Sequence, residues 1–203
     1  MNTLYTIGHS NHEIAKFLDL LSQHEITALV DVRSQPYSRF APHFSKRPLI
    51  SSLKKQGIEY VFLGKELGAR SDNPSCYDHG KVQYDRLAEE PSFKAGLDRL
   101  LQGMKKYRIE VMCAEKEPTD CHRALLVARK IFESGIFVQH IHADGHLESQ
   151  EEMETRLLRL CKIPESDLFT SRSTNISEAY AIQGAKIAYK DESMLEEESA
   201  RNL

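Results

Sequence analysis

Short apolar runs alternate with amphipathic stretches along most of this chain, and this alternation restricts its fold more than any other feature. Runs with the length and composition of buried strands lie at residues 4–7, 28–32, 59–63, 109–113 and 137–141. Between them apolar residues recur at helical spacing, as at Ile14, Phe17, Leu18 and Leu21. Strands that alternate with helices predict a single-domain, three-layer α/β fold with a mostly parallel sheet flanked by helices.

The apolar pattern thins toward the C-terminus. A chain of 203 residues is within the size of one domain, and we assign residues 1–170 to that single α/β domain. Residues 171–203 have few periodic apolar positions, and they include the acidic run Glu196, Glu197 and Glu198. We therefore expect residues 171–203 to be a C-terminal extension that is partly disordered.

The sequence contains neither an export signal nor an apolar stretch long enough to span a bilayer. Without an export signal, the four cysteines Cys76, Cys113, Cys121 and Cys161 favour reduced thiols over disulfides. We therefore expect a cytoplasmic protein with no membrane partner. The net charge of −3 restricts any binding of nucleic acid to a local basic surface.

Polar residues gather after the predicted strands. Ligands of open parallel sheets bind beyond the carboxyl ends of the strands, so residues at these ends are candidates for a common site. We place there His9, Ser10, Asp31, Arg33, Glu66, Cys113, Glu115, His122 and Arg123. The fifth strand ends at His140 and His142. We expect most of the site residues to converge on one cleft, with the glycine-containing segment 64–81 as a mobile cover.

The segment from Cys113 to Arg123 is the most informative part of this edge. A thiol that faces a helix N-terminus has a lowered pKa and becomes a nucleophile. Arg123 in a first helical turn opposes the helix dipole, which suggests an anion between its guanidinium and the free amides. We assign catalytic roles to Cys113, Glu115, Asp31 and His9. Substrate binding is assigned to Arg33, Arg123, His122, Ser10 and Glu66.

Two known thiol chemistries match this segment in part. A phosphatase-type cradle places arginine six residues after the cysteine, where this chain has Thr119. Asp31 and Arg33, followed by a strand that ends in Cys113, resemble the layout of rhodanese sulfurtransferases. Rhodanese loops are short and usually contain glycine, whereas the loop after Cys113 is longer and has none.

Zinc is the other use of thiols beside an imidazole. Cys113, Cys121 and His122 offer three ligands, with His9 or His142 as a fourth. Neighbouring residues of a helix point about 100° apart, which argues against a shared ion for Cys121 and His122. The leading interpretation therefore has no metal ligands, and the sequence specifies no cofactor.

The segment 33–47 is a second cluster. It carries Arg33, Arg39, Lys46 and Arg47, interleaved with Tyr37, Phe40 and Phe44. Cations with stacking rings suit a nucleotide or a single-stranded nucleic acid. A surface loop held down by its aromatic residues is the alternative interpretation, and two prolines favour a shaped wall over a slack connection.

Several short motifs in order resemble family 488 of the domains of unknown function. They are Thr6-Ile7-Gly8-His9-Ser10, Leu29-Val30-Asp31-Val32-Arg33 with Pro36, Leu63-Gly64-Lys65-Glu66-Leu67-Gly68, Met112-Cys113-Ala114-Glu115, Cys121-His122-Arg123 and His140-Ile141-His142-Ala143-Asp144-Gly145. The resemblance spans roughly residues 3–147 and implies no established reaction. Ala69 departs from the glycine expected after Gly68.

Three functions are consistent with these observations. The first is an enzyme acting on a small phosphorylated or nucleotide-like substrate, with Cys113 or Glu115 in chemistry and Arg33 and Arg123 on an anion. The second is a module that binds single-stranded nucleic acid through residues 33–47. The third is a zinc-binding structural or regulatory protein. The sequence does not indicate the oligomeric state.

Overall fold

The computed structural model describes residues 3–166 and 168–193 of the chain. Its main sheet has six strands in the order β3-β2-β6-β1-β7-β8. These strands are β1 (Thr3–Gly8), β2 (Ala28–Asp31), β3 (Glu59–Phe62), β6 (Ile109–Cys113), β7 (Phe137–Ile141) and β8 (Leu147–Ser149). All neighbours pair in parallel except β7 and β8, which are antiparallel. The predicted α/β fold with a mostly parallel sheet is confirmed.

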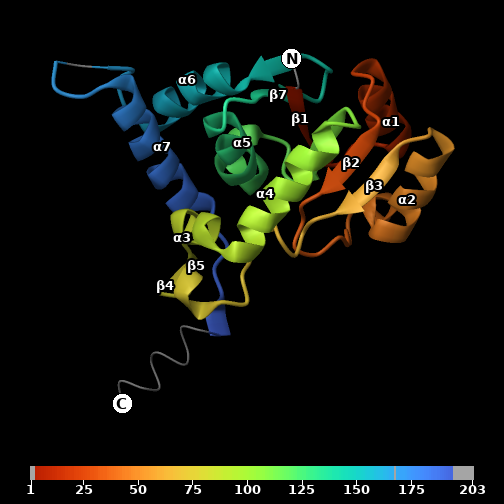
Figure 1. Ribbon diagram of the computed structural model, residues 1–203, viewed down its shortest axis with the longest axis horizontal. Coiled ribbons are helices and arrows are strands. Elements are labelled where there is room, and N and C mark those ends of the chain that lie inside the picture. Colours follow the sequence, from red (N-terminus) through yellow and green to blue (C-terminus); the bar gives the residue numbers. More distant parts are fainter. Residues whose placement is uncertain (1–2, 167, 194–203) are drawn as a thin grey trace.

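Helices cover both faces of the sheet (Figure 1). On one face α1 (Ile14–Gln23) and α2 (Lys46–Lys55) bury Phe17, Leu21 and Leu53 against sheet residues such as Met112. On the other face α4 (Pro91–Met104), α5 (Arg129–Glu133) and the π-helical turn η4 (Arg123–Ala128) pack on β6 and its neighbours. The apolar faces read from helical spacing are therefore the faces that form the two main cores.

The position of β6 decides where the site lies. The chain passes from β1 to β2, which is not its neighbour, because β6 lies between them. It then passes from β6 to β7 across β1. The two crossovers therefore leave β1 and β6 in opposite directions, and a crevice forms at such a switch point. Gly8 pairs with Cys113 at this point, so both strands deliver their carboxyl ends to the same crevice.

Smaller elements complete the fold. Short 3-10 turns occur at Pro42–Phe44, Pro74–Cys76 and Pro118–Asp120. A small hairpin consists of β4 (Tyr77–Asp78) and β5 (Lys81–Val82), and α3 (Tyr84–Glu89) follows it. The segment 118–134 is built from a 3-10 turn, η4 and α5. Within residues 3–166 and 168–193, no helix is long and apolar enough to cross a membrane.

The C-terminal segment differs from the expectation over much of its length. Residues after 171 were expected to be partly disordered, but Arg172–Ile187 form the helix α7. It packs on α6 (Gln150–Cys161) and buries Ala179 and Tyr180 against Leu157. Figure 1 shows α7 running from α6 toward the β4–β5 hairpin. The acidic run at 196–198 lies outside the described residues.

Candidate functional site

A cavity of about 410 Å³ lies at the crevice between β1, β2 and β6. Of the residues predicted for the site, His9, Arg33, Cys113, Glu115 and His122 line it. Asp31 lies behind Arg33, and Arg123 lies behind the loop that carries Glu115. The strand ends chosen from the sequence thus meet at one cavity, although some of the predicted residues support the cavity wall instead of lining it.

The cavity floor holds a compact cluster of possible metal ligands. The ligand atoms of Cys113, Glu115, Cys121 and His122 all lie within 4.8 Å of one another. Cys113 Sγ is 3.6 Å from His122 Nδ1, and Cys121 Sγ is 3.0 Å from Glu115 Oε2. A tetrahedral zinc site, with Zn–S of ~2.3 Å and Zn–N of ~2.0 Å, separates its ligand atoms by roughly 3.4–3.8 Å. The cluster therefore needs little rearrangement to hold such an ion.

The backbone around Cys121 explains why this cluster forms. Cys121 is extended, with φ −139° and ψ 134°, whereas His122 is helical, with φ −59° and ψ −26°. The prediction that both lie on one helix, about 100° apart, was wrong because the helix begins only after Cys121. The change from extended to helical backbone lets both side chains reach the end of β6.

Hydrogen bonding fixes which nitrogen of His122 faces the thiols. His122 Nε2 is 3.2 Å from the carbonyl oxygen of Val32. A carbonyl only accepts, so Nε2 carries a proton and donates it. In the neutral ring Nδ1 is then unprotonated and directs its lone pair at Cys113 Sγ. Metal-binding histidines commonly hold their second nitrogen on a backbone carbonyl in this way.

The pKa values of the two thiols are shifted in opposite directions. Burial raises the pKa of Cys113 well above its ordinary value, and the adjacent Cys121 adds to the effect. Burial also acts on Cys121, but the Cys113 hydrogen bond and the Arg123 charge outweigh it and lower the pKa of Cys121 well below its ordinary value. The expected activation of Cys113 by the helix end is therefore not found, and Cys121 is the acidic thiol.

Glu115 is the cluster member that faces solvent. Cys113, Cys121 and His122 are buried, whereas the side chain of Glu115 is exposed along the cavity. Partial burial of its carboxyl group and the nearby Cys121 raise the pKa of Glu115. A carboxyl group at the open side of three buried ligands is placed to exchange protons with a molecule in the cavity.

Arg123 supports the loop that follows β6. Its side chain is fully buried, and its guanidinium donates to the carbonyls of Glu115, at 2.6 Å, and Lys116, at 3.1 Å. Arg123 was expected to hold an anion, but its guanidinium points into the loop and lies outside the cavity lining, and its Nε has no hydrogen-bond partner among the described residues. Arg123 instead fixes the backbone next to Glu115.

Gly8 allows the same loop to lie close to β1. A Cβ atom at Gly8 would lie 1.8 Å from the carbonyl oxygen of Glu115, so any side chain there would displace the loop. Beyond Gly8, the amides of His9 and Ser10 donate to the carbonyls of Cys113 and Ala114, each at 2.9 Å. Ser10, a predicted substrate ligand, thus contributes its backbone to the loop, and its side chain is outside the cavity lining.

Arg33 and Asp31 form a buried ion pair in the cavity wall. Arg33 Nε and Nη2 donate to the two carboxylate oxygens of Asp31 at 2.9 and 2.7 Å. Arg33 Nη1 is 3.1 Å from Nε2 of His9, and Tyr60 donates to Asp31 at 2.8 Å. Burial and the Arg33 charge lower the pKa of His9 to about 4. His9 is therefore neutral near pH 7, and Asp31, predicted to be catalytic, is out of reach of the cavity.

The model of one protein family, Domain of unknown function DUF488, matches residues 13–129. The chain belongs to the DUF488 family. No curated protein and no solved structure matched the chain in the other two comparisons.

The DUF488 match contains the whole Cys113–Arg123 segment and the loop at 33–47. It ends before the histidine-rich turn after β7, which the sequence motifs had included. His140, which lies within β7 before that turn, is buried between Thr6 and Gln150, and burial lowers its pKa to about 3. Glu66 also lies apart from the cluster, because it pairs with Arg99 at the rim of a neighbouring cavity. The cluster of Cys113, Glu115, Cys121 and His122 therefore lies within the DUF488 match, whereas His9, Ile187 and Tyr189 of the cavity wall lie outside it.

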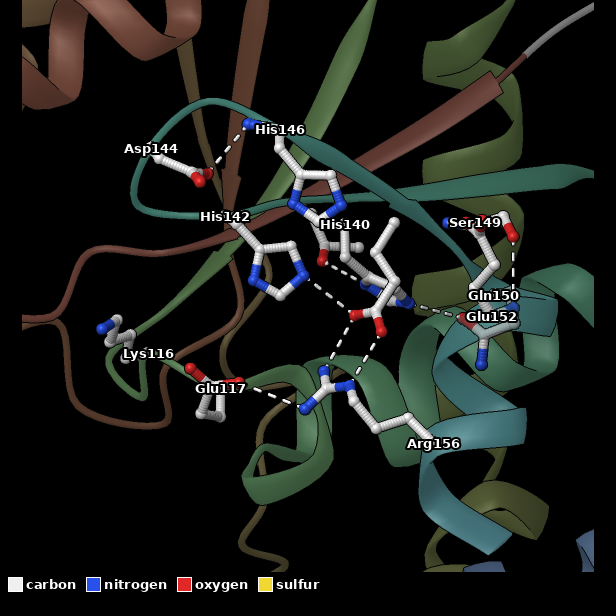
Figure 2. A network of polar contacts seen from close by, with 12 residues as sticks. Lys116, Glu117, His140, His142, Asp144, His146, Ser149, Gln150, Glu152 and Arg156 are labelled. Carbon is white, nitrogen blue, oxygen red and sulfur yellow. Dashed lines mark hydrogen bonds and ion pairs between the residues drawn. The ribbon is translucent and has the colours of Figure 1, made fainter. Parts of the chain in front are cut away.

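The turn after β7 also helps to hold the loop that follows β6, through a chain of polar contacts. His142 contacts Glu148 of β8 at 2.9 Å, and Glu148 accepts two hydrogen bonds from Arg156 of α6. Figure 2 shows the guanidinium of Arg156 extending to Glu117, and the atoms are 3.3 Å apart. Glu117 follows Glu115 and Lys116, so this network and Arg123 hold the same loop from two sides.

Several residues of the cavity wall lie outside the motifs and could not be predicted from the sequence pattern. Tyr84, Ile187 and Tyr189 line the cavity from beyond or beside the sheet. Arg70 lies over the ring of Tyr189 at 4.0 Å, and it lines the cavity together with Ala69. Only tertiary packing brings these residues to the crevice. The segment 64–81 therefore does border the cavity, while its mobility stays a prediction.

Proposed function

We propose that this protein is a metal-dependent enzyme that binds zinc through Cys113, Cys121 and His122 and acts on a small anionic substrate in the adjoining cavity. The observation that carries the proposal is the cluster itself, with its ligand atoms within 4.8 Å of one another. Two thiols and an imidazole are a known catalytic zinc set, and catalytic zinc keeps a position open for water or substrate.

The degree of burial separates the residues that would bind the metal from the residue that would transfer protons. The two thiols and His122 are almost inaccessible, as metal ligands are, whereas Glu115 is exposed along the cavity. Zinc lowers the pKa of water at its open position and polarises bound oxygen atoms. With zinc held there, Glu115 would be placed to accept a proton from a water molecule in the cavity and to return it to a leaving group. Arg123 and Gly8 keep the loop of Glu115 in place.

The cavity favours an anionic, phosphorylated or nucleotide-like substrate. Arg70 lines the cavity, and no carboxylate in residues 3–166 or 168–193 is paired with it, whereas Arg33 is neutralised by Asp31. Tyr37, Tyr84 and Tyr189 add ring surfaces, and the volume of about 410 Å³ is that of a small-molecule site. A purely structural zinc site is less favoured, because such sites are closed and this cluster opens on a cavity.

The first test is the metal content of the purified protein. We expect close to one zinc per chain by elemental analysis, and loss of most of it in Cys121→Ser and His122→Ala. Cys161→Ser is the matched control, because Cys161 is also a free thiol but lies in α6, outside the cluster. Substoichiometric zinc in the wild type, or equal zinc in the His122 variant, would exclude the metal site.

The second test separates binding from chemistry at Glu115. Hydrolysis of phosphate monoesters, phosphodiesters and mononucleotides would be measured for the wild type and for Glu115→Gln. If Glu115 moves protons, the amide variant keeps its zinc and loses at least about a hundredfold in rate, the usual scale of a general base. If it loses zinc in proportion to activity, Glu115 is a ligand and its assigned role is wrong.

A further inference from the structure

The loop between β2 and α2 presents aromatic rings to solvent beside the cavity. The side chains of Tyr37 and Phe40 are 70% and 91% exposed. Arg39 lies over the Phe40 ring, 5.0 Å from its centre. The same loop buries Phe44 completely. The loop therefore can bury an aromatic side chain, yet the side chains of Tyr37 and Phe40 remain exposed to solvent.

This loop has a positive net charge, whereas the whole chain has a negative one. Between residues 33 and 47 there are Arg33, Arg39, Lys46 and Arg47 and no Asp or Glu, although the whole chain has a net charge of −3. Asp31 neutralises Arg33. No ion pair joins Arg39, Lys46 or Arg47 to a carboxylate within the described parts of the chain. The exposed cations therefore remain available to a polyanion.

Hydrogen bonds hold the loop in a fixed shape. Arg33 Nη2 donates to the carbonyl of Phe44 at 2.8 Å, and the amide of Lys46 donates to Pro36 at 2.9 Å. The amide of Ser38 donates to Ser45 Oγ at 3.2 Å. Exposed rings on a fixed loop lose little conformational entropy when a ligand stacks on them.

The loop is continuous with the cavity. Gln35, Tyr37 and Ser38 line the cavity wall, and Arg39 and Phe40 follow directly outside the lining. A ligand that enters the cavity beside Tyr37 would therefore continue over Phe40. Rings that alternate with cations are the features by which proteins hold bases and phosphates of single strands.

We propose that this loop binds single-stranded nucleic acid and directs the terminal nucleotide of the strand into the cavity. Tyr37 stacks on the base at the cavity mouth, Phe40 stacks on the next base, and Arg39 and Arg47 contact the phosphates. Binding of the strand stands on the loop alone. Delivery of the terminal nucleotide to the zinc centre rests on the proposed function.

The test is fluorescence anisotropy with a labelled twelve-nucleotide oligothymidylate at low salt. We expect saturable binding, weakened at least about tenfold in the double variant Tyr37→Ala, Phe40→Ala, which is the scale of lost base stacking. Tyr107→Ala is the matched control, because Tyr107 is 42% exposed outside this loop. Arg39→Ala, Arg47→Ala would flatten the dependence of affinity on salt. Unchanged melting temperatures show that the variants are folded.

Several results would overturn the proposal. The first two are that the wild type does not bind oligothymidylate, or that the Tyr37→Ala, Phe40→Ala variant binds it with the same affinity as the wild type. The other two are that polyglutamate displaces the labelled strand as effectively as unlabelled strand does, or that thymidine monophosphate binds more tightly than the strand. Removal of the zinc from the wild-type protein with a chelator separates the two proposals, because strand binding that depends only on the loop should then be unchanged. Zinc without strand binding contradicts this inference only, and strand binding without zinc contradicts the proposed metal centre only.

Discussion

Arg33 and Asp31 form a buried ion pair in the cavity wall, with Arg33 lining the cavity and Asp31 fully buried behind it. The carboxylate receives hydrogen bonds from Arg33 and Tyr60, and the guanidinium also reaches His9 and the carbonyl of Phe44. A buried pair of this kind is satisfied only as a unit, because removal of one partner leaves the other charge uncompensated.

Asp31→Asn should therefore destabilise the protein by about 3 kcal/mol or more. The asparagine keeps the shape of the side chain but leaves the Arg33 guanidinium buried without its counter-charge. Urea unfolding of the wild type and the variant measures the difference. Tyr60→Phe is the control, since it removes one hydrogen bond to Asp31 and should cost about 1 kcal/mol. Equal losses in the two variants would mean that the ion pair contributes little.

Sequence reasoning located the residues of the cluster better than their directions. Cys113, Glu115 and His122 were expected at the strand end and do line the cavity. Arg123 was expected to face it and points into the loop. The difference depends on where the helix begins, because one extended residue at Cys121 rotates all that follow it. Helix starts are among the least certain features of a sequence pattern.

At the scale of elements, the connection from β6 to η4 is held by contacts from separate parts of the chain. Gly8 of β1 admits the loop, Arg123 of η4 binds its carbonyls, and Arg156 of α6 binds Glu117. Arg156 is itself oriented by Glu148 of β8. The β8–α6 unit thus stabilises the site without contributing a residue to the cavity.

Glu148→Gln should lower the free energy of unfolding near neutral pH, and it should make that free energy depend less on pH in the acidic range. Burial opposes the charge of Glu148, but hydrogen bonds from His142 and Arg156 outweigh burial and lower the pKa of Glu148 from 4.5 to about 2. Because this pKa is lower in the folded state, the stabilisation is present above pH 4.5 and is lost as pH falls toward 2. We expect a deficit of roughly 2–3 kcal/mol at pH 7.

Thermal unfolding of Glu148→Gln and wild type at pH 7, 4 and 2.5 measures this effect. The gap between the two melting temperatures should narrow as the pH falls, because protonation makes the wild-type carboxyl resemble the amide. Glu151→Gln on the exposed start of α6 is the control and should show no such convergence. A gap that is constant with pH would place the effect in packing instead of charge.

The longer elements could be predicted and the shorter ones could not. Strands 109–113 and 137–141 match β6 and β7 in their bounds, and α1 and α4 follow their apolar spacing. The two-residue strands β4 and β5 and the short helix α3 carry no period that a pattern could reveal. β8 pairs with β7 through contacts that no local signal encodes.

At the scale of the whole molecule, α7 joins the C-terminal segment to the domain. Its Tyr180 is 4% exposed and contacts Gln150 and Glu154 of α6. The far end of α7 reaches β5, where the amide of Val82 donates to the carbonyl of Tyr189 at 3.0 Å. Ile187 and Tyr189 then line the cavity, so the segment that was expected to be an extension completes the cavity wall.

Tyr180→Ala should cost about 3–4 kcal/mol, because it leaves a hole between α6 and α7 and removes both hydrogen bonds. Ile182→Ala on the same helix, 46% exposed, is the control and should change stability little. Chemical unfolding of both variants gives the comparison. Wild-type stability in Tyr180→Ala would show that the packing of α7 on α6 contributes little to the stability of the domain.

Strand order could not be read from the sequence, because any order of the same strands satisfies the same apolar runs. The helix within residues 171–203 could not be read from the sequence either, because its buried positions form no clear apolar period. α7 buries Asn175, Ala179, Tyr180, Gln183 and Gly184, and most of these are small or polar residues. Small residues permit close helix packing but give only a weak apolar period.

The insertion of β6 between β1 and β2 sets the order in which the chain can fold. β1 pairs with β6 and β7, both of which are synthesised after residue 108. A nascent chain that ends before β6 can pair β2 with β3, while β1 has no ladder partner on either side. Such late, long-range pairing slows folding and keeps strand edges open until the sheet closes. β6 joins β1 to the β2–β3 pair and also carries Cys113, so the centre of the sheet and the strand end at the site form in the same step.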